Sequence, residues 1–573
     1  MAGIAGWAIP SGLAARRGQD ERALLPMAEA LSHRTGDGES LLACVDQRRR
    51  QQLVMSASLW DRRAGIAIAL DGAFSNGAEL RARLARGGFR LGEGSDAELL
   101  MRAYQYWDKD AVRHLRGPFA LALWDSHKDR LMLARDRFGE RPLYVEERDG
   151  GLYFGSEPKA LLRAPGARFE PDLEAMRECL AHRYVSGSAT LFRGIRRFPP
   201  GTCGFWQFGR LHSTRYWTPP DRQPAQRPGL RDERAEEAFI AALAESASLC
   251  AAEAVLLSGG MDSALLLAVL SAQGGRLRTF SLGFEDDRRS ELAQARAAAR
   301  HFGAEHHEIV LRSGELLADL NRLVAYHDAP LARPSALAVH CLAAEASRVA
   351  RRLVTGDGCE ELVGGYRRHV AERLHPGFCA SLLAREGRWV SKILPSAAGA
   401  PKAASEGRKD GFPEADPQAS ALRRELYREQ TSLLPDELLE RNDRAAAAAG
   451  SELRMPFVDH ALAELVSSLA DDHRVRGLST KWIVRRAARR LVPEGLGRRK
   501  AGFRPPLGGW LRHELRETLL EHLRGGESQT RRYYDAAALD RLLDAHLNGR
   551  RDYASPLWTL LNLEIWHRQS SRV

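Results

Sequence analysis

The sequence predicts an α/β protein of two domains, and its length and two different hydrophobic patterns support this prediction. A chain of 573 residues is too long for a single hydrophobic core, so we expect two or three domains. Up to about residue 210, short apolar strands with hairpin turns accompany two amphipathic helices. From about Asp232, helices alternate with short apolar strands, a rhythm typical of a parallel sheet covered by helices.

The local patterns predict individual elements. In the first region, strands are expected at 66–70, 119–124, 130–134 and 152–154, and a helix at 96–107. The segment 219–228 is rich in proline and polar residues, which indicates a linker. In the second region, strands are expected at 254–257, 278–284, 308–311 and 352–355, and helices at 263–272 and 291–302. Beyond Tyr366 we expect mostly helix, interrupted by a mobile surface loop at 395–420.

Charge and cysteine content narrow the class of protein. The net charge is +11, from 85 basic and 74 acidic residues, but arginine is spread along the chain and no basic stretch is interleaved with aromatic residues. We therefore expect no nucleic-acid partner, whereas an acidic peptide substrate is compatible with this charge. Seven cysteines without paired spacing favour reduced thiols and a cytoplasmic location. No signal-peptide pattern or long apolar run is present, which argues against membrane association.

One glycine-rich motif predicts a nucleotide site. The run Ser258-Gly259-Gly260-Met261-Asp262-Ser263 directly follows an apolar strand ending at Leu257 and directly precedes a helix. Backbone N–H groups of such a turn, at a helix N-terminus, form an anion site suited to pyrophosphate. The two serines can donate hydrogen bonds and Asp262 can hold Mg²⁺. A tight turn with a helix cap is the alternative, but strand, turn and helix in register favour the nucleotide site.

Two further motifs follow predicted strands. The first is Ser281-Leu282-Gly283, and the second is Thr355-Gly356-Asp357-Gly358-Cys359-Glu360-Glu361, which continues to Tyr366. All three motifs therefore lie at predicted carboxyl ends of strands, where open α/β sheets bind ligands.

These motifs resemble those of known enzymes. S-G-G-x-D-S is similar to the pyrophosphate-binding loop of the ATP-pyrophosphatase superfamily, and the 355–366 segment resembles the S-G-D-G-G-D-E-L-F-G-G-Y of asparagine synthetases. Further matches to class B asparagine synthetases span nearly the entire chain; they lie at 134–144, 154–161, 198–201, 452–459, 480–482 and 498–511. Where the family has a metal-binding aspartate in this segment, the chain has Glu360, whose side chain is one methylene longer.

The resemblance implies a domain plan and a set of site residues. It implies an N-terminal-nucleophile (Ntn) type αββα glutaminase-like sandwich at 1–212, a linker at 213–230, and an ATP-pyrophosphatase α/β domain with a parallel sheet and helical extension at 231–573. ATP and Mg²⁺ are the implied cofactors, with Asp262 and Glu360 as metal ligands. Lys481 is expected near the α-phosphate, neutralising charge as pyrophosphate leaves, and Asp357 and Glu361 are expected to serve catalysis. For Glu361, an acid at a helix N-terminus is the alternative. The implied nucleotide contacts are Leu257, Ser258, Gly259, Gly260, Asp262, Ser263, Ser281, Leu282, Gly283 and Gly356.

Departures from the family predict that glutamine hydrolysis has been lost. Ala2 stands where the family exposes a nucleophilic cysteine, and a methyl group cannot attack an amide. The family's glutamine-binding N-G-E reads Asp71-Gly72-Ala73, and its R-G-P-D reads Arg34-Thr35-Gly36-Asp37. Only 95–98 retains the family's S-D-x-E. We expect the N-terminal domain to persist for packing and for shaping a substrate channel.

The synthetase half departs at one position. The family's D-E-P reads Asp328-Ala329-Pro330, so the glutamate thought to help amine attack is replaced by a methyl group. Substrate groups, Asp328, His327 or Asp357 are candidates to take over proton transfer, and the sequence does not rank them.

Members of this superfamily without the cysteine include β-lactam synthetases, carbapenam synthetases and lasso peptide macrocyclases, which adenylate a carboxylate that an amine of the same molecule attacks. The first hypothesis is a lasso peptide macrocyclase that uses ATP and Mg²⁺ to join the N-terminal amine of a linear precursor peptide to an Asp or Glu side chain. A partner leader peptidase or leader-binding protein is expected with it. The alternatives are an ammonia-dependent asparagine synthetase-like or β-lactam synthetase-like ligase, and a non-catalytic scaffold.

Overall fold

Two stacked antiparallel sheets form the N-terminal domain of the computed structural model. The model describes residues 3–10, 21–34, 42–47, 51–92, 94–284, 291–312, 314, 320–394, 413–497 and 505–572. The first sheet has the order β10 (Arg196–Arg197), β8 (Tyr144–Arg148), β9 (Gly151–Gly155), β1 (Ala5–Pro10), β3 (Gln51–Ala57), β2 (Leu42–Gln47). The second has the order β12 (Arg210–Arg215), β11 (Thr202–Gln207), β7 (Arg130–Arg135), β6 (Phe119–Asp125), β5 (Ile66–Gly72), β4 (Leu59–Asp61).

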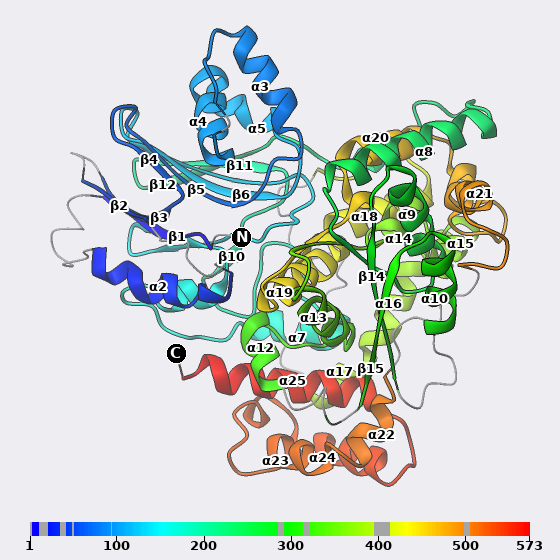
Figure 1. The fold of residues 1–573 in the computed structure, drawn as a ribbon. Helices are drawn as coiled ribbons and strands as arrows, with labels where there is room; N and C mark the ends of the chain where they lie inside the picture. Colours follow the sequence, from blue (N-terminus) through cyan, green and yellow to red (C-terminus); the bar gives the residue numbers. More distant parts are fainter. Residues whose placement is uncertain are drawn as a thin grey trace.

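Strand β6 shows why these sheets stack. Every residue of β6 is buried, because alternate side chains point to opposite faces and both faces are covered. Leu121 and Leu123 pack against the helices outside the second sheet, whereas Ala120 and Trp124 pack between the two sheets. The outer helices are α3 (Gly77–Arg86), α4 (Asp96–Trp107) and α5 (Ala111–His114) on the second sheet, and α2 (Leu25–Glu29) and α6 (Pro158–Leu162) on the first. The predicted αββα sandwich is confirmed (Figure 1).

A five-stranded parallel sheet forms the centre of the C-terminal domain. Its order is β15 (Glu305–Leu311), β14 (Arg278–Phe284), β13 (Ala254–Leu256), β16 (Arg352–Val354), β17 (Glu452–Arg454). Successive strands run outward from β13 in one direction and then from β16 in the other, so the crevice between β13 and β16 is the switch point where such sheets bind ligands. The sequence pattern did not reveal β17, because its single apolar residue, Leu453, lies between two charged residues and forms no apolar run.

Helices cover both faces of this sheet. One face packs against α8 (Asp232–Leu249), α9 (Met261–Ala272), α10 (Leu292–His301), α20 (His460–Ser468) and α21 (Trp482–Leu491). The other packs against α13 (Ser335–Ala346) and α19 (Glu440–Ala448). The parallel sheet with a helical extension agrees with the prediction. The remaining helices are α7 (Leu173–His182), α12 (Leu320–His327), α14 (Cys359–Val363), α15 (Arg367–Leu374), α16 (Phe378–Glu386), α17 (Val390–Ile393), α18 (Ala421–Thr431), α22 (Leu507–Arg512), α23 (Arg516–Leu523) and α24 (Ala536–Leu547).

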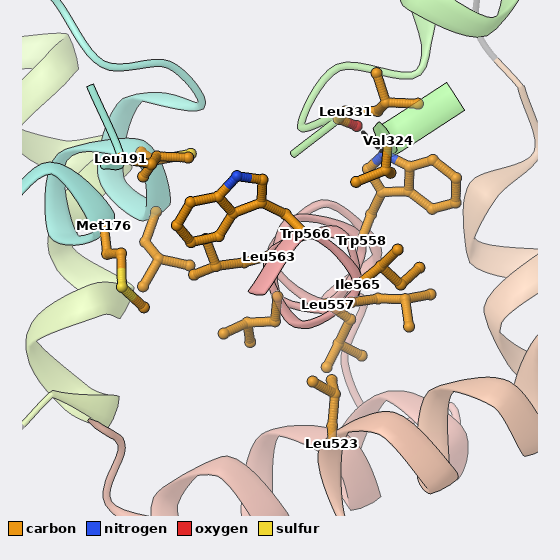
Figure 2. Packing of buried hydrophobic residues seen from close by; sticks show 14 of the residues in the cluster. Met176, Leu191, Val324, Leu331, Leu523, Leu557, Trp558, Leu563, Ile565 and Trp566 are labelled. Carbon is orange, nitrogen blue, oxygen red and sulfur yellow. Dashed lines mark hydrogen bonds between the residues drawn. The ribbon is translucent and has the colours of Figure 1, made fainter. Parts of the chain in front are cut away.

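The C-terminal helix α25 (Ala554–Ser570) joins the two halves of the molecule. It is apolar on several faces, and Trp558 and Trp566 are almost fully buried and project from it in two different directions (Figure 2). Trp566 lies beside Leu191 of the N-terminal region, whereas Trp558 lies near Val324 of α12. These side chains belong to one hydrophobic cluster that contains residues of both domains. Burial of each large apolar side chain stabilises the fold by roughly 1.5–3 kcal/mol, so this cluster helps to hold the two domains together.

The segment predicted to be a linker is anchored to the C-terminal domain. Asp221 lies in a short helical turn, Pro220–Arg222, and is fully buried. Its carboxylate pairs with Arg474 at 2.7 Å and accepts a hydrogen bond from Gln430 at 2.9 Å. Of the predicted loop at 395–420, residues 395–412 lie outside the described part of the chain, as do 498–504 of the last family motif. No helix in the described ranges is long and apolar enough to cross a membrane.

Candidate active site

Two loops meet at the carboxyl edge of the parallel sheet, one after β13 and one after β16. Gly356 approaches so closely that a Cβ there would lie 3.3 Å from the Cβ of Asp262. Gly259 has a φ of +80°, and a Cβ on it would lie 2.7 Å from the carbonyl oxygen of Glu291. Gly259 therefore needs glycine, because a side chain would strain its backbone and collide with the chain just before α10, whereas a Cβ at Gly356 would make a tight contact with the loop after β13.

The loop after β13 forms a cradle of donors at the start of α9. Ser258 Oγ lies 3.1 Å from Ser263 Oγ and accepts a hydrogen bond from the backbone N–H of Gly260 at 3.3 Å. The 12-residue helix α9 begins at Met261, so its free N–H groups and the positive end of its dipole face this loop. The geometry suits a phosphate group.

Lys481 connects the two loops. Its Nζ lies 2.5 Å from Asp262 Oδ2 and 3.2 Å from Glu360 Oε1. Burial acts to lower the pKa of Lys481, but Cys359, Asp262 and Glu360 raise it above its ordinary value, so the amine is charged. Only 5% of the residue is exposed, and a Cβ on the adjacent Gly365 would collide with its side chain.

The two carboxylates around Lys481 fit a magnesium site. Asp262 and Glu360 come from different loops and converge on one cation, and Mg²⁺ is usually held by one or two carboxylates together with substrate phosphates. Among the described residues, no group of three or more His, Cys, Asp or Glu is arranged as a metal site.

Glu361 and Asp357 have different surroundings. Glu361 is 1% exposed and accepts a hydrogen bond from the hydroxyl of Tyr366. Burial, followed by the charge of Glu429, raises the pKa of Glu361 to about 7, so it is not a solvated acid at a helix end. Asp357 accepts a hydrogen bond from Asn442 Nδ2 at 2.8 Å, which orients its carboxylate at the end of β16.

The predicted contacts on β14 divide into two groups. Ser281 is buried and donates its hydroxyl to the carbonyl oxygen of Leu257 at 2.5 Å, so it links β14 to the nucleotide loop. Leu282 packs against the core around α25, and Gly283 pairs with Val310 of β15. The structure therefore brings together the predicted residues of the two loops and Lys481, while Leu282 points into the core.

An open cavity lies between the two domains, and most of its lining residues were not predicted from the sequence. Its N-terminal wall includes Tyr144, Tyr184 and Arg197, and its C-terminal wall includes Ala329 and Arg441. Arg441 lines this cavity, and the charges of Glu437 and of Asp357, in the loop after β16, raise its pKa against the effect of burial. The only signal in the sequence was the Asp-Ala-Pro departure at 328–330, which proves to line the cavity.

The cavity wall carries an excess of positive charge. Glu437 is shared by Arg441, at 2.8 Å, and Arg333, at 3.6 Å. Burial raises the pKa of Asp436 to about 8, so this acid is mostly neutral at pH 7. Five arginines line the described wall, against four acids; they are Arg183, Arg197, Arg333, Arg441 and Arg444, and Asp328, Asp436, Glu437 and Glu440.

The glutaminase-like site is closed by an internal ion cluster. The guanidinium of Arg34 contacts Asp71 at 3.0 Å, Glu157 at 2.8 Å and, from α19 of the other domain, Asp443 at 2.8 Å. The Arg34 side chain is fully buried. Thus Arg34, which matches the first residue of the family's R-G-P-D, and Asp71, which replaces the Asn of the glutamine-binding N-G-E, bind each other; Ala2 and 35–37 lie outside the described residues.

The retained S-D-x-E at 95–98 has a structural role. Ser95 is the N-cap of α4 and accepts a hydrogen bond from the backbone N–H of Glu98 at 3.3 Å. Asp96 accepts one from the backbone N–H of Phe74 at 3.0 Å. Capping and loop anchoring therefore account for this motif.

Comparisons with known proteins agree with this architecture. Residues 235–568 match the asparagine synthase family and residues 1–217 match the glutamine amidotransferase domain. Asparagine synthetase [glutamine-hydrolyzing] 1 of Bacillus subtilis (strain 168) is 28% identical over 548 residues, covering 87% of this chain and 85% of that protein. A putative asparagine synthetase [glutamine-hydrolyzing] of Mycobacterium tuberculosis (strain ATCC 25618 / H37Rv) is 30% identical over 556 residues, covering 87% and 84%.

Among solved structures, the glutamine phosphoribosylpyrophosphate amidotransferase from B. subtilis covers 54% of this chain and 65% of that chain, at 15% identity and a TM-score of 0.26. This structural likeness is weak, and the family assignment rests on the family matches and on the two synthetases. The chain therefore belongs to the asparagine synthase family and is an ATP-dependent carbon–nitrogen ligase that forms AMP.

Proposed function

We propose that this protein is a lasso peptide macrocyclase, which joins a carboxylate and an amine of one linear precursor peptide without hydrolysing glutamine. The observation that carries the proposal is the buried contact of Arg34 with Asp71, Glu157 and Asp443. A guanidinium surrounded by three carboxylates has no charge left for the carboxylate of glutamine. The amine for the reaction must then come from elsewhere, and an amine in the same molecule needs no ammonia supply.

The interdomain cavity supports a peptide as substrate. Its lining combines apolar and aromatic side chains, such as Leu191 and Phe192, with a few charged groups, as ligand pockets usually do. The surplus of arginine on its wall suits a peptide that presents an Asp or Glu side chain. Ala329 leaves free the space that a glutamate would occupy, so a larger acceptor than ammonia can approach the nucleotide loops.

The nucleotide loops support activation of that carboxylate. Asp262 and Glu360 would hold Mg²⁺, which neutralises phosphate charge when bound. Ser258, Ser263 and the N-terminus of α9 would bind the pyrophosphate, and Lys481 would stabilise the charge that develops on the α-phosphate. The amine then attacks the acyl carbon of the adenylate. The new C–N bond replaces the C–O bond to AMP, which leaves with the electron pair as one N–H proton is released.

Ring closure on one peptide has an entropic advantage. When amine and adenylate are held in one site, the second step is unimolecular, and effective concentrations of roughly 10⁵ M or more are reached in well-oriented cases. We further propose that a leader peptidase or leader-binding protein supplies the peptide in the cytoplasm, and that neither nucleic acid nor a membrane takes part.

The test is pyrophosphate and AMP release from ATP in two parallel incubations. One contains a linear peptide with an N-terminal glycine and an internal Asp or Glu, followed by mass for the loss of one water; the other contains aspartate and ammonia. Turnover with water loss only in the peptide incubation supports the macrocyclase. Turnover only with aspartate and ammonia contradicts it and favours the ammonia-dependent alternative, which the 28–30% identity to asparagine synthetases motivates. A β-lactam synthetase-like activity would require a small β-amino acid instead.

A further inference from the structure

His327 is a buried histidine with an unused nitrogen on the wall of the interdomain cavity. It is the last residue of α12 and only 6% of its surface is exposed. Its Nε2 is buried and has no hydrogen-bond partner among the residues that the structure describes. A buried polar atom without a partner costs about 1–3 kcal/mol, so a ligand that supplies the missing hydrogen bond is favoured here.

The other two residues that the sequence left open are already engaged. Asp328 accepts a hydrogen bond from the backbone N–H of Lys159 at 3.1 Å, and its carboxylate lies 3.5 Å from Lys159 Nζ. It also lies 4.0 Å from Arg444. Asp357 is held by Asn442, at 2.8 Å, and is not among the residues that line the cavity. His327 is therefore the one of these three candidates with a free polar atom beside the cavity.

The surroundings of His327 keep its ring uncharged. Burial first, and then the positive charges of Arg444, His340, Lys159 and Arg441, lower its pKa well below the ordinary value. At neutral pH one ring nitrogen therefore carries a lone pair. The same cations disfavour a protonated amine nearby, and an unprotonated amine is the form that can attack.

The loop after His327 is held rigidly. Asp328 adopts a left-handed backbone with φ of +51°, and its contacts with Lys159 tie it to the N-terminal domain. On the other side, the indole Nε1 of Trp558 on α25 donates to the carbonyl oxygen of Leu331 at 2.6 Å. Both domains and the central helix therefore position His327, and a backbone strained in this way is characteristic of functional sites.

We propose that His327 binds the attacking amine: with the ring proton on Nδ1, its Nε2 accepts a hydrogen bond from an N–H of the uncharged amine. The lone pair of that amine is then directed along the cavity toward the adenylate at the nucleotide loops. This inference rests on the proposed function, since it assigns a site to the amine of the peptide. His327 would thus take the place of the family's glutamate, which is missing at Ala329, two residues later in the chain.

The test separates the two half-reactions in His327→Leu, which removes the acceptor, and His327→Gln, which can return one. Peptide-dependent ATP–pyrophosphate exchange reports adenylation, and loss of one water from the peptide reports ring closure. We expect His327→Leu to keep exchange within about twofold of wild type and to lose at least tenfold in ring closure, with His327→Gln recovering part of the loss. The matched control is His546→Gln in α24: His546 is also buried with an Nε2 that has no partner among the described residues, but it does not line the cavity, so neither exchange nor ring closure should change.

A parallel fall of exchange and closure in His327→Leu would overturn the inference, because it would indicate a structural role. Unchanged closure would overturn it as well. If the wild-type protein turns over only aspartate and ammonia, the macrocyclase proposal fails. The inference is then tested by the KM for ammonia, which His327→Leu should raise at least tenfold. If wild type shows exchange with neither substrate, the proposed function fails and the inference with it.

Discussion

Arg34 Nη1 and Asp443 Oδ2 lie 2.8 Å apart in a buried ion pair that joins the N-terminal sandwich to helix α19, across 409 positions of sequence. In the same cluster, Arg141 contacts Asp443 at 2.7 Å. A site that resembles a glutamine pocket has thus become part of the interface between the domains.

Removing one member of this pair should destabilise the whole protein. Asp443→Leu leaves Arg34 and Arg141 buried with less compensation, and breaking a buried pair costs about 3–5 kcal/mol. Chemical unfolding should show a loss of this size. Glu170→Gln breaks the exposed pair with Arg193 and should cost less than about 1 kcal/mol. Equal stability of Asp443→Leu and wild type would mean that the cluster contributes nothing to the interface.

Lys481→Met should abolish adenylation while the protein stays folded. The variant removes the cation between Asp262 and Glu360, and losing one group that stabilises transition-state charge costs about 10²–10³ in rate. ATP–pyrophosphate exchange is the measurement, and Lys128→Ala, on an exposed surface, is the control. Full exchange by Lys481→Met would place the phosphate-stabilising group elsewhere.

Asp436 should make stability fall as pH rises. An unfolded aspartate ionises near pH 4, whereas burial raises the pKa of Asp436 to about 8, so between these values the folded protein holds a proton that the unfolded chain has lost. Asp436→Asn mimics the protonated form and should gain stability relative to wild type between pH 5 and about pH 8. Unfolding in urea at several pH values measures this. A stability difference that does not change with pH would mean that Asp436 is ionised in the fold.

Ala329→Glu should block ring closure without blocking adenylation. The new carboxylate would enter the cavity beside His327 and occupy the space and the positive field that we assign to the peptide. We expect at least a tenfold loss of cyclic product, with ATP–pyrophosphate exchange preserved. Ala329→Ser, nearly the same size and uncharged, should cyclise like wild type. Normal cyclisation by Ala329→Glu would place the acceptor outside this cavity.

Local signals in the sequence were enough for the elements whose residues interact with near neighbours. Helix α4 begins at Asp96 and ends at Trp107 as predicted, because Ser95 caps it and its apolar residues repeat at helical spacing. Strand β14 also has the predicted bounds, 278–284, because its residues form a short, largely apolar run. The nucleotide loop was recognisable because strand, glycine turn and helix are contiguous in the chain, and a phosphate cradle needs little else.

The sequence by itself determined the fold class, the family and the position of the glycine-rich loop between β13 and α9, since these depend on short-range patterns. The tertiary structure alone decided that Arg34 binds Asp443, that α25 is buried between the domains, and that His327, in contrast to Asp328, keeps a side-chain polar atom with no partner among the described residues. Each of these depends on which distant side chains meet in three dimensions. Charge pairing, desolvation and cavity shape arise only from that packing, and no local pattern in the chain encodes them.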